Sequence, residues 1–421
     1  MMVEERSKIE SAAAVDVVIA GGGLVGGSLA IALAEAGIQV SLIEAVEPDS
    51  SEQPSFDDRM IALSHSSCKI LRSLGLWAPI EEAVWPIDRI HISEQARFGT
   101  SVIDAGEQGI RELGHVIKAR ELGVALWHRI NELEAINVLC PARVVSTARV
   151  DSDTREVRIQ SHNVTRTLTC RLLAVADGAR SKVRAGLGIT ARVHDYEQTA
   201  LVANIQVDAR FAGHQAFERF TPDGPLAVLP GPAGRYTVVL ARGADAVQQF
   251  MEMSDVAFVD ALESILGLRL GRLSRVGKRH AYPLALVETD VLVAERAVVM
   301  GNAAHSLHPV AGQGFNLALR DVATLVELLA NARATDAEAF DAGASAALSA
   351  YADWRHVDQR RVVGFTDGLI RGFGNTYPGA GPLRGLGLAL FDIAPPAKRL
   401  LARQTMGLAG RMTRLARGLS L

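Results

Sequence analysis

Two short apolar runs flank a helical stretch near the start of the chain. Residues 17–20 and 38–43 are β-type runs, and residues 24–36 between them have the composition of a helix that ends at Gly37. A strand, a helix and a second strand in this order are typical of α/β proteins. We therefore predict that the chain begins with an α/β unit.

The central part of the chain reads mainly as strands. Residues 144–170 alternate as in a meander, and residues 172–176 read as one further short, buried strand. A helical stretch at 248–266 follows later, and after Asp321 the pattern is almost wholly helical. Between these parts lie the strand-like runs 201–207, 225–230 and 235–242. The pattern predicts a β-rich region inserted between α/β segments.

Glycines join the first strand to the first helix. Gly21, Gly23 and Gly26 have the spacing G-x-G-x-x-G, and Glu44 stands at the end of the second strand. Such glycines permit a tight turn, the close approach of a pyrophosphate and the packing of helix on strand, while the carboxylate accepts hydrogen bonds from an adenosine ribose. This order of features favours dinucleotide binding over the alternative of a purely structural β–α turn.

A second glycine-rich loop occurs nearly 300 residues later. The apolar run 297–300 stops at Gly301, and a helix-like stretch begins at Phe315 after a loop that carries Pro309, Gly312, Gln313 and Gly314. A loop that opens a helix directs free backbone N–H groups and the positive helix end toward an anion. Two such devices in one chain indicate a single long ligand that is held at separate points.

Composition excludes several classes of protein. The chain has 421 residues with 48% hydrophobic and 22% charged residues, and its net charge of −3 does not favour nucleic-acid binding. Cys68, Cys140 and Cys170 lack metal-type spacing, so we predict no metal site. The N-terminal segment is polar, and no apolar run reaches the ~18 residues of a membrane span, so we expect a cytoplasmic protein.

A third motif connects the first two to a known family. Residues 174–176 are apolar, and Asp177-Gly178 then leads into Arg180 and Ser181. The G-x-G-x-x-G, this Asp-Gly motif and the Gly301 loop in this order resemble the class A FAD-dependent aromatic hydroxylases of the p-hydroxybenzoate hydroxylase-like family. Segments 57–64, 218–226 and 301–321 narrow the resemblance to the ubiquinone-biosynthesis hydroxylases. The likeness runs from about Val15 to Arg361.

The resemblance implies an α/β fold with a Rossmann-like FAD-binding domain that is discontinuous in sequence. Its parts would be residues 1–82, 113–185 and 286–345. Residues 83–112 and 186–285 would form an inserted β-rich substrate domain, and residues 346–421 a helical C-terminal region.

The resemblance also assigns roles around FAD. Gly21, Gly23 and Gly26 would surround the pyrophosphate, Glu44 the adenosine ribose, and Val144 would offer its backbone to the adenine. Arg59 and Arg120 would be basic contacts of the flavin and the FAD linker, and Asp177 and Gly178 would meet the flavin and the nicotinamide path. Gly301 and Asn302 would approach the ribityl chain. The isoalloxazine edge would be held by Pro309, Gly312, Gln313, Gly314, Phe315 and Asn316.

Asn302 departs from the usual Gly-Asp of the family. An asparagine still accepts through its carbonyl and donates through its amide, so it can serve a ribityl hydroxyl. It lacks the carboxylate's charge, and we expect somewhat looser FAD binding.

The implied activity is hydroxylation of the ring of a polyprenylated phenol in ubiquinone biosynthesis. NAD(P)H would reduce FAD, and O₂ would then give a flavin C4a-hydroperoxide whose terminal oxygen the ring attacks. Water must be kept from this intermediate. Three alternatives stay open: another ring position, another aromatic substrate, and a flavin-binding assembly subunit without turnover.

No conventional catalytic cluster appears in the sequence. His305 and His308 are the ionisable side chains of the loop near the expected flavin, and either a structural role or a part in deprotonating the phenol would suit them. Phe220 and Pro230 in the inserted region are candidates for substrate contact, with packing as the alternative.

The C-terminal residues 395–421 carry six basic residues and no acidic one, with leucines at roughly helical spacing. A basic amphipathic helix would suit peripheral contact with the inner face of a membrane. The alternative is that this helix packs on the chain's own domain or on a partner protein. Other ubiquinone-biosynthesis proteins are the expected partners.

Overall fold

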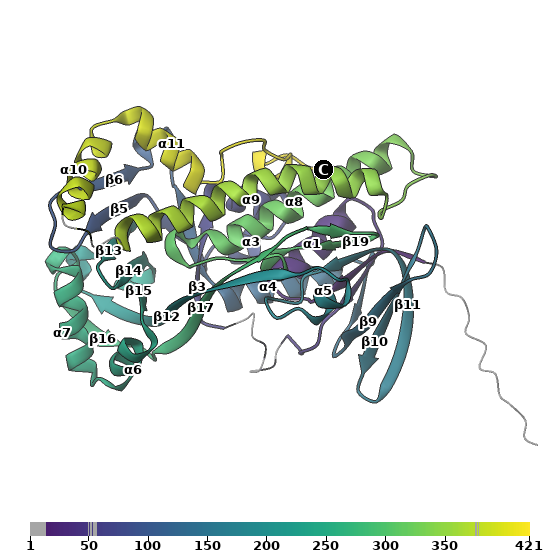
Figure 1. Ribbon diagram of the computed structural model, residues 1–421, viewed down its shortest axis with the longest axis horizontal. Coiled ribbons are helices and arrows are strands. Elements are labelled where there is room, and N and C mark those ends of the chain that lie inside the picture. The colour runs from purple at the N-terminus through teal and green to yellow at the C-terminus, as the bar shows by residue number, and fades with distance from the viewer. Residues whose placement is uncertain (1–13, 49, 51–52, 54–56, 375–376, 378) are drawn as a thin grey trace, which may run out of the picture.

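The computed structural model describes residues 14–48, 50, 53, 57–374, 377 and 379–421 (Figure 1). The polar N-terminal segment 1–13, which we expected not to be a secretory signal, lies outside these residues. Within the described part, the strands form three sheets. A sheet covered by helices and a strand-rich inserted region together confirm the predicted α/β class.

The first sheet has five parallel strands in the order β19-β11-β1-β2-β8. An antiparallel meander, β9–β10–β11, and the short β18 extend it. The bounds are β1 Val15–Ala20, β2 Val40–Ile43, β8 Ile136–Leu139, β9 Arg143–Arg149, β10 Arg155–Ser161, β11 Val164–Val175, β18 Val293–Ala294 and β19 Ala297–Val299. β11 is a single strand of 12 residues, so the predicted separate strand at 172–176 continues the meander.

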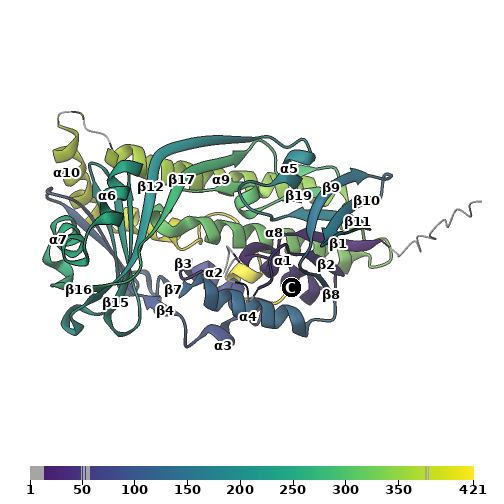
Figure 2. The ribbon, with the colours of Figure 1, turned by 90° about the horizontal axis from the view of Figure 1, so that it is seen from below.

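The second sheet comes from the inserted region, in the order β20-β17-β12-β15-β14-β13-β5-β6 with β16 beside β12. Its strands are β5 Arg89–Glu94, β6 Thr100–Asp104, β12 Ala191–Val207, β13 Gln215–Thr221, β14 Gly224–Pro230, β15 Arg235–Arg242, β16 Leu273–Val276, β17 His280–Thr289 and β20 His305–Ser306. The long strands β12 and β17 pair side by side and run from the β-rich lobe, which is the inserted region, toward the α/β lobe, which contains the first sheet (Figure 2). β17 thus continues beyond the boundary we predicted at residue 286.

A small third sheet, β3-β7-β4, joins the two lobes. Its strands are β3 Met60–Ser64, β4 Trp85–Ile87 and β7 Gly114–Lys118.

Two helices rather than one interrupt the inserted strands, because Met253 is extended and Ser254 caps a new helix. The helices are α1 Leu24–Glu35, α2 His65–Ser73, α3 Trp77–Ile80, α4 Ala119–Glu132, α5 Lys182–Gly186, α6 Ala244–Glu252, α7 Asp255–Leu266, α8 Gln313–Thr335, α9 Ser345–Gly374, α10 Ala380–Asp392 and α11 Pro395–Thr405.

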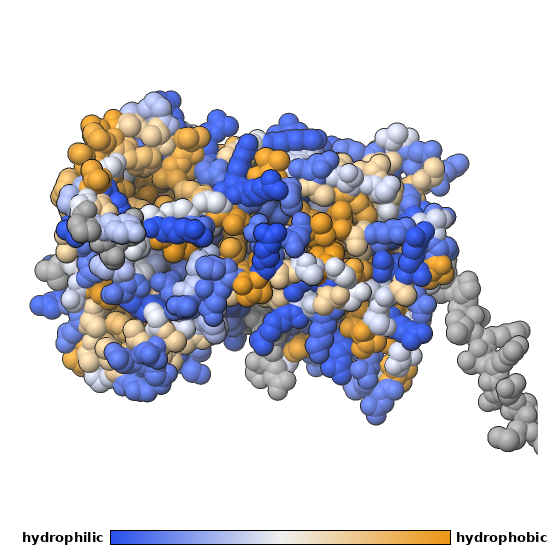
Figure 3. Space-filling model, in the orientation of Figure 1, coloured by the Kyte–Doolittle hydropathy of each residue, from blue (hydrophilic) through white to orange (hydrophobic). Residues whose placement is uncertain are grey.

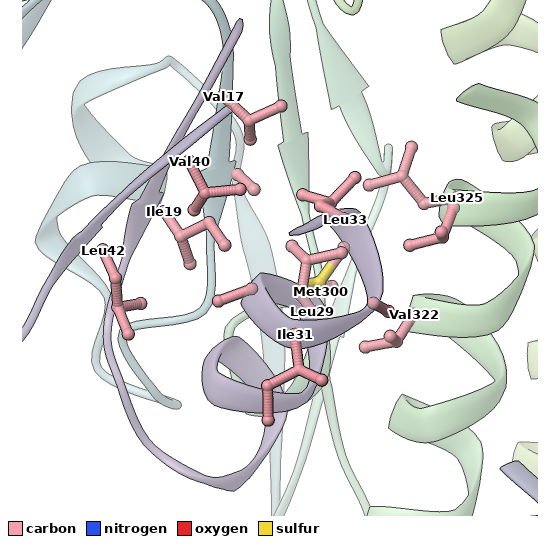
Figure 4. Close-up of a cluster of buried hydrophobic side chains, with 14 of the residues drawn as sticks. Val17, Ile19, Leu29, Ile31, Leu33, Val40, Leu42, Met300, Val322 and Leu325 are labelled. Carbon is pink, nitrogen blue, oxygen red and sulfur yellow. The ribbon is translucent and has the colours of Figure 1, made fainter. Parts of the chain in front are cut away.

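The main core lies where α1 is enclosed between the first sheet and α8 (Figure 4). Leu29, Ile31 and Leu33 of α1 are fully buried, although they point in different directions around the helix. A helix that is covered on nearly all sides needs no polar face, which explains why its sequence is apolar except for Ser28 and the exposed Glu35 at its end. This packing fixes the N-terminal ends of α1 and α8 at the same side of the sheet.

The single amphipathic helix predicted for residues 395–421 is wrong beyond Thr405. Gly407 and Gly410 have φ of +72° and +81°, a left-handed conformation that ends the helix. Leu415 is then buried among core side chains, and Glu327 of α8 accepts a hydrogen bond from the backbone of Arg414. The last segment therefore packs on the chain's own α/β lobe.

Candidate active site

A cavity of about 970 Å³ lies between the two main sheets. Its lining combines the β1–α1 loop, the end of β2, the Asp177–Gly178 turn and the loop before α8 with β3, the inserted sheet, α9 and α11. The volume is at the upper end for ligand pockets, which span roughly 300–1,000 Å³. Three motifs that are far apart in sequence thus share one cavity.

The β1–α1 loop forms one end of the cavity. A side chain at Gly21 would place its Cβ 2.6 Å from the carbonyl oxygen of Ala176, and Gly21 has φ of +102°. Glu44 Oε2 accepts a hydrogen bond from the Gly22 amide at 2.5 Å, and Oε1 accepts one from the Val46 amide at 2.9 Å. The carboxylate is therefore held directly beside the glycine loop.

Gly26 is not among the residues that line the cavity. A Cβ at Gly26 would lie only 1.9 Å from the carbonyl oxygen of Gly21. Its missing side chain lets α1 begin against the loop, so Gly26 shapes the loop rather than bordering the ligand space.

The Asp177–Gly178 turn lies beside this loop. Both residues line the cavity, and Gly178 has φ of +91°. Burial raises the pKa of Asp177 above its usual value, partly offset by a hydrogen bond from Ser181. Arg184 Nη1 donates to the carbonyl oxygen of Ala303 at 2.8 Å, which ties this turn to the second glycine-rich loop.

The second loop closes the cavity at the start of α8. Ala311 and Gly312 have φ of +58° and +57°, and α8 begins at Gln313, two residues earlier than predicted. Pro309, Gly314 and Phe315 also line the cavity, and Asn302 is exposed at its wall. The free N–H groups at the start of a 23-residue helix thus face the ligand space.

Asn316 and Gln313 line the cavity, but their side chains are bound to the protein. Asn316 Oδ1 accepts from the Ser64 amide at 2.8 Å, and its amide donates to the carbonyl oxygens of Ala62 and Gly312. Gln313 Nε2 donates to the carbonyl oxygen of Ala311 at 2.9 Å. Asn316 therefore fixes the start of α8 against β3, whereas Gln313 Nε2 also donates to the carbonyl oxygen of Thr405 at the end of α11, at 3.3 Å.

Four other predicted residues do not line the cavity. Arg120 is exposed, and its Nε lies 3.8 Å from Asp58 Oδ1. Arg59 and Val144, in contrast, do line the cavity. Pro230 is buried at the end of β14, so it packs and does not face the ligand space, while Phe220 faces it. The other two residues are Gly301, which packs on Val25, and His305.

The two loop histidines are engaged within the protein. His305 is buried, with Nε2 2.5 Å from Asp321 Oδ2. His308 borders the cavity, but Nδ1 accepts the Val310 amide at 3.2 Å and Nε2 faces Gln198 Oε1 at 3.2 Å. Burial lowers the pKa of His308 to about 4, so it is neutral at physiological pH. These contacts favour the structural role.

Glu218 is a cavity residue that we did not single out from the sequence. It shares its face of β13 with Ala216 and Phe220, since residues two apart on a strand point the same way. An ionisable residue on an otherwise apolar strand face was the available signal.

Comparison with known proteins agrees with this geometry. A family model described as "FAD binding domain" matches residues 14–366. The ubiquinone hydroxylase UbiL of Rhodospirillum rubrum is 35% identical over 96% of this chain and 93% of its own. The 3-demethoxyubiquinol 3-hydroxylase of Escherichia coli is 31% identical over 93% and 98%. The chain belongs to the FAD-dependent monooxygenases that include the ubiquinone hydroxylases.

The fold agrees with that of a solved monooxygenase. The p-nitrophenol 4-monooxygenase PnpA of Pseudomonas putida superposes with a TM-score of 0.76 at 18% identity, covering 95% of this chain and 99% of the other. The family model and the two ubiquinone-hydroxylase relatives confirm the family resemblance read from the motifs. FAD is the cofactor of this monooxygenase, and NAD(P)H and O₂ are the co-substrates typical of its family.

The residues of the cavity fit FAD. Gly21 lets the β1–α1 loop lie against the backbone of Ala176, Glu44 is fixed where a ribose hydroxyl can bond, and the start of α8 offers N–H groups to an anionic ring edge. Arg180 and Lys182 add positive charge to the wall. Among the described residues, no helix is both long and apolar enough to span a bilayer.

Proposed function

We propose that this monooxygenase hydroxylates the ring of a polyprenylated phenol in ubiquinone biosynthesis. The observation that carries the proposal is a group of apolar cavity-lining side chains from the inserted sheet and the C-terminal helices. These side chains come from β5, β6, α9 and α11, with Leu113 just before β7 and Met406 just after α11; the others are Ile90, Ile92, Ile103, Phe365, Leu369 and Leu401. An apolar extension of this kind suits a prenyl chain. The names of the relatives support the same substrate class.

We assign each end of the cavity one task. Gly21, Gly23 and Glu44 would hold the dinucleotide part of FAD, and the loop from Pro309 to the start of α8 would hold the isoalloxazine. Bound FAD, reduced by NAD(P)H, supplies the activated oxygen that amino-acid side chains cannot. The apolar walls would exclude water from the reacting ring.

The test uses the purified, FAD-bound protein with a short-chain prenyl-methoxyphenol. The motif of residues 301–321 is similar to that of 2-octaprenyl-6-methoxyphenol hydroxylase, so this phenol is the first choice. We expect the phenol to stimulate NAD(P)H oxidation and ¹⁸O from ¹⁸O₂ to appear in the product. Bound FAD without stimulation by any prenylated phenol would contradict the proposal and favour a different aromatic substrate or an assembly role.

We also propose that the face formed by α10 and α11 contacts an anionic lipid surface. Leu383, Leu386 and Leu390 recur along one side of α10, and each is about half exposed or more. Ile393 and Leu400 are more than 70% exposed, and the apolar area over α10 is visible in Figure 3.

This face is continuous with the end of the cavity. Leu401 lines the cavity, and its neighbour Leu400 is exposed beside the basic residues Arg399 and Arg403. An apolar surface with flanking arginines suits an anionic membrane surface. A prenylated substrate could then enter from the lipid without crossing water.

A further inference from the structure

Glu218 lies in the cavity wall at the junction between the flavin-side loop and the inserted sheet. It pairs with Ala227 on β14 and Ile92 on β5, and both of these residues also line the cavity. The same face carries Ala216 and Phe220 two positions away along β13. Glu218 is therefore a single carboxyl group in an apolar floor.

The carboxyl group is poorly compensated by the protein. Its Oε1 is inaccessible to solvent and has no hydrogen-bond partner among the described residues. The backbone N–H of Ala311 favours the charged form. A carboxylate oxygen that is buried without a hydrogen-bond partner destabilises the fold, so a structural role alone is a poor explanation for it.

The surroundings of Glu218 bring its pKa close to the pH at which enzymes work. Burial raises its pKa to about 7, and the opposing contribution comes from the Ala311 N–H. The charged residues that line the cavity, Glu44, Arg59, Arg143, Asp177, Arg180 and Lys182, belong to the dinucleotide and flavin end, and none of them contributes to this shift. A carboxyl group whose pKa is near 7 is suited to general-base catalysis.

Ala311 belongs to the loop that would lie against the isoalloxazine, and its φ of +58° is unusual for a residue with a side chain. Glu218 thus borders the space between that loop and the apolar floor, where a substrate ring would lie beside the flavin. His308, a titratable side chain of this loop that lines the cavity, already accepts a hydrogen bond at Nδ1. Among the described carboxyl groups that line the cavity, Glu218 has an oxygen, Oε1, without a hydrogen-bond partner.

We propose that Glu218 is the catalytic base that binds the phenol hydroxyl of the substrate and removes its proton. This inference rests on the proposed function. The substrate O–H bond breaks, the proton binds a carboxylate oxygen of Glu218, and the electron pair stays on the phenolate oxygen. No electrons pass to the protein. The phenolate donates electron density into the ring and makes the ring carbon a better nucleophile toward activated oxygen.

The first test is Glu218→Gln in the FAD-bound protein, with Glu156→Gln on β10, remote from the cavity, as the matched control. The amide can still accept from Ala311 N–H but cannot take a proton. We expect kcat for hydroxylation to fall roughly 100- to 10,000-fold, with FAD content and KM little changed. The acidic limb near pH 7 of the wild-type kcat profile should disappear.

A second measurement separates a base from a structural residue. Ring-fluorinated prenylphenols ionise more readily, so the ratio of wild-type to variant rates should shrink as the phenol becomes more acidic.

The outcomes are distinguishable. Hydroxylation by the wild type with equal kcat and an equal pH profile in Glu218→Gln would overturn the role of Glu218 and leave the proposed function intact. A constant rate ratio across the fluorinated series would overturn it as well. Failure of the wild type to bind or hydroxylate any prenylphenol would overturn both proposals.

Discussion

Nε2 of His305 lies 2.5 Å from Oδ2 of Asp321, and both side chains are almost completely buried. Asp321 Oδ1 also accepts from Arg355 Nε at 2.6 Å and from Gln359 Nε2 at 3.2 Å. Burial alone would raise the pKa of Asp321, but the charges of Arg355 and His305 lower it to about 2. This group joins the second glycine-rich loop to α8 and α9.

Breaking this group should destabilise the protein strongly. In Asp321→Asn the Arg355 charge stays buried with less compensation, and we expect a loss of about 3–5 kcal/mol in the free energy of unfolding, measured with urea. The control Asp290→Asn removes an exposed partner of Arg192 and should cost about 0–1 kcal/mol. Equal losses in the two variants would contradict the importance of the buried group.

Acid should weaken the fold in a defined range. Burial lowers the pKa of His115 and of His308 to about 4 from an ordinary value of 6.5. The folded pKa lies below the unfolded one, so the unfolded state binds more protons. The stabilisation is complete above pH 6.5 and is lost as the pH falls through about 4.

The variant His115→Gln tests this sign. It should reduce the slope of unfolding free energy against pH by up to one proton, about 1.4 kcal/mol per pH unit. His128→Gln alters an exposed histidine on α4 and should leave the slope unchanged. A slope in His115→Gln as steep as that of the wild type would refute the assignment.

A side chain at Gly26 should abolish FAD binding. In Gly26→Val the Cβ cannot remain 1.9 Å from the Gly21 carbonyl oxygen, so the β1–α1 loop must move. We expect purified protein without the yellow flavin spectrum. The control Gly368→Ala, at a position on α9 with open space, should retain FAD. Stoichiometric flavin in Gly26→Val would show that the loop does not hold the nucleotide.

The α10–α11 face should bind lipid. The double variant Leu383→Glu, Ile393→Glu should lose sedimentation with phosphatidylglycerol vesicles, because it places charge on the apolar surface. Val256→Glu changes an equally exposed valine on α7 and should bind like the wild type. Wild-type protein that stays in the supernatant, or that forms dimers which the double variant lacks, would instead indicate a protein partner for this face.

The sequence by itself determined the local devices of the FAD site. Gly21 and Gly312 require backbone conformations that few other residues adopt, and the Asp177–Gly178 turn follows an apolar strand. These requirements depend on neighbours in the chain, so residue type and spacing reveal them. The order of the three motifs was then enough to indicate the family and the α/β fold.

Only the tertiary structure decided which side chains share the cavity. Ser64 and Asn316 form a hydrogen bond although 252 positions separate them. Glu218 lines the cavity whereas Pro230 is buried in packing, and this difference depends on the strands with which β13 and β14 pair. The C-terminal leucines fit one continuous α-helix in the sequence, yet Leu415 is buried in a short 3₁₀ turn after two left-handed glycines. Such outcomes follow from long-range packing and desolvation, which no local pattern of residues encodes.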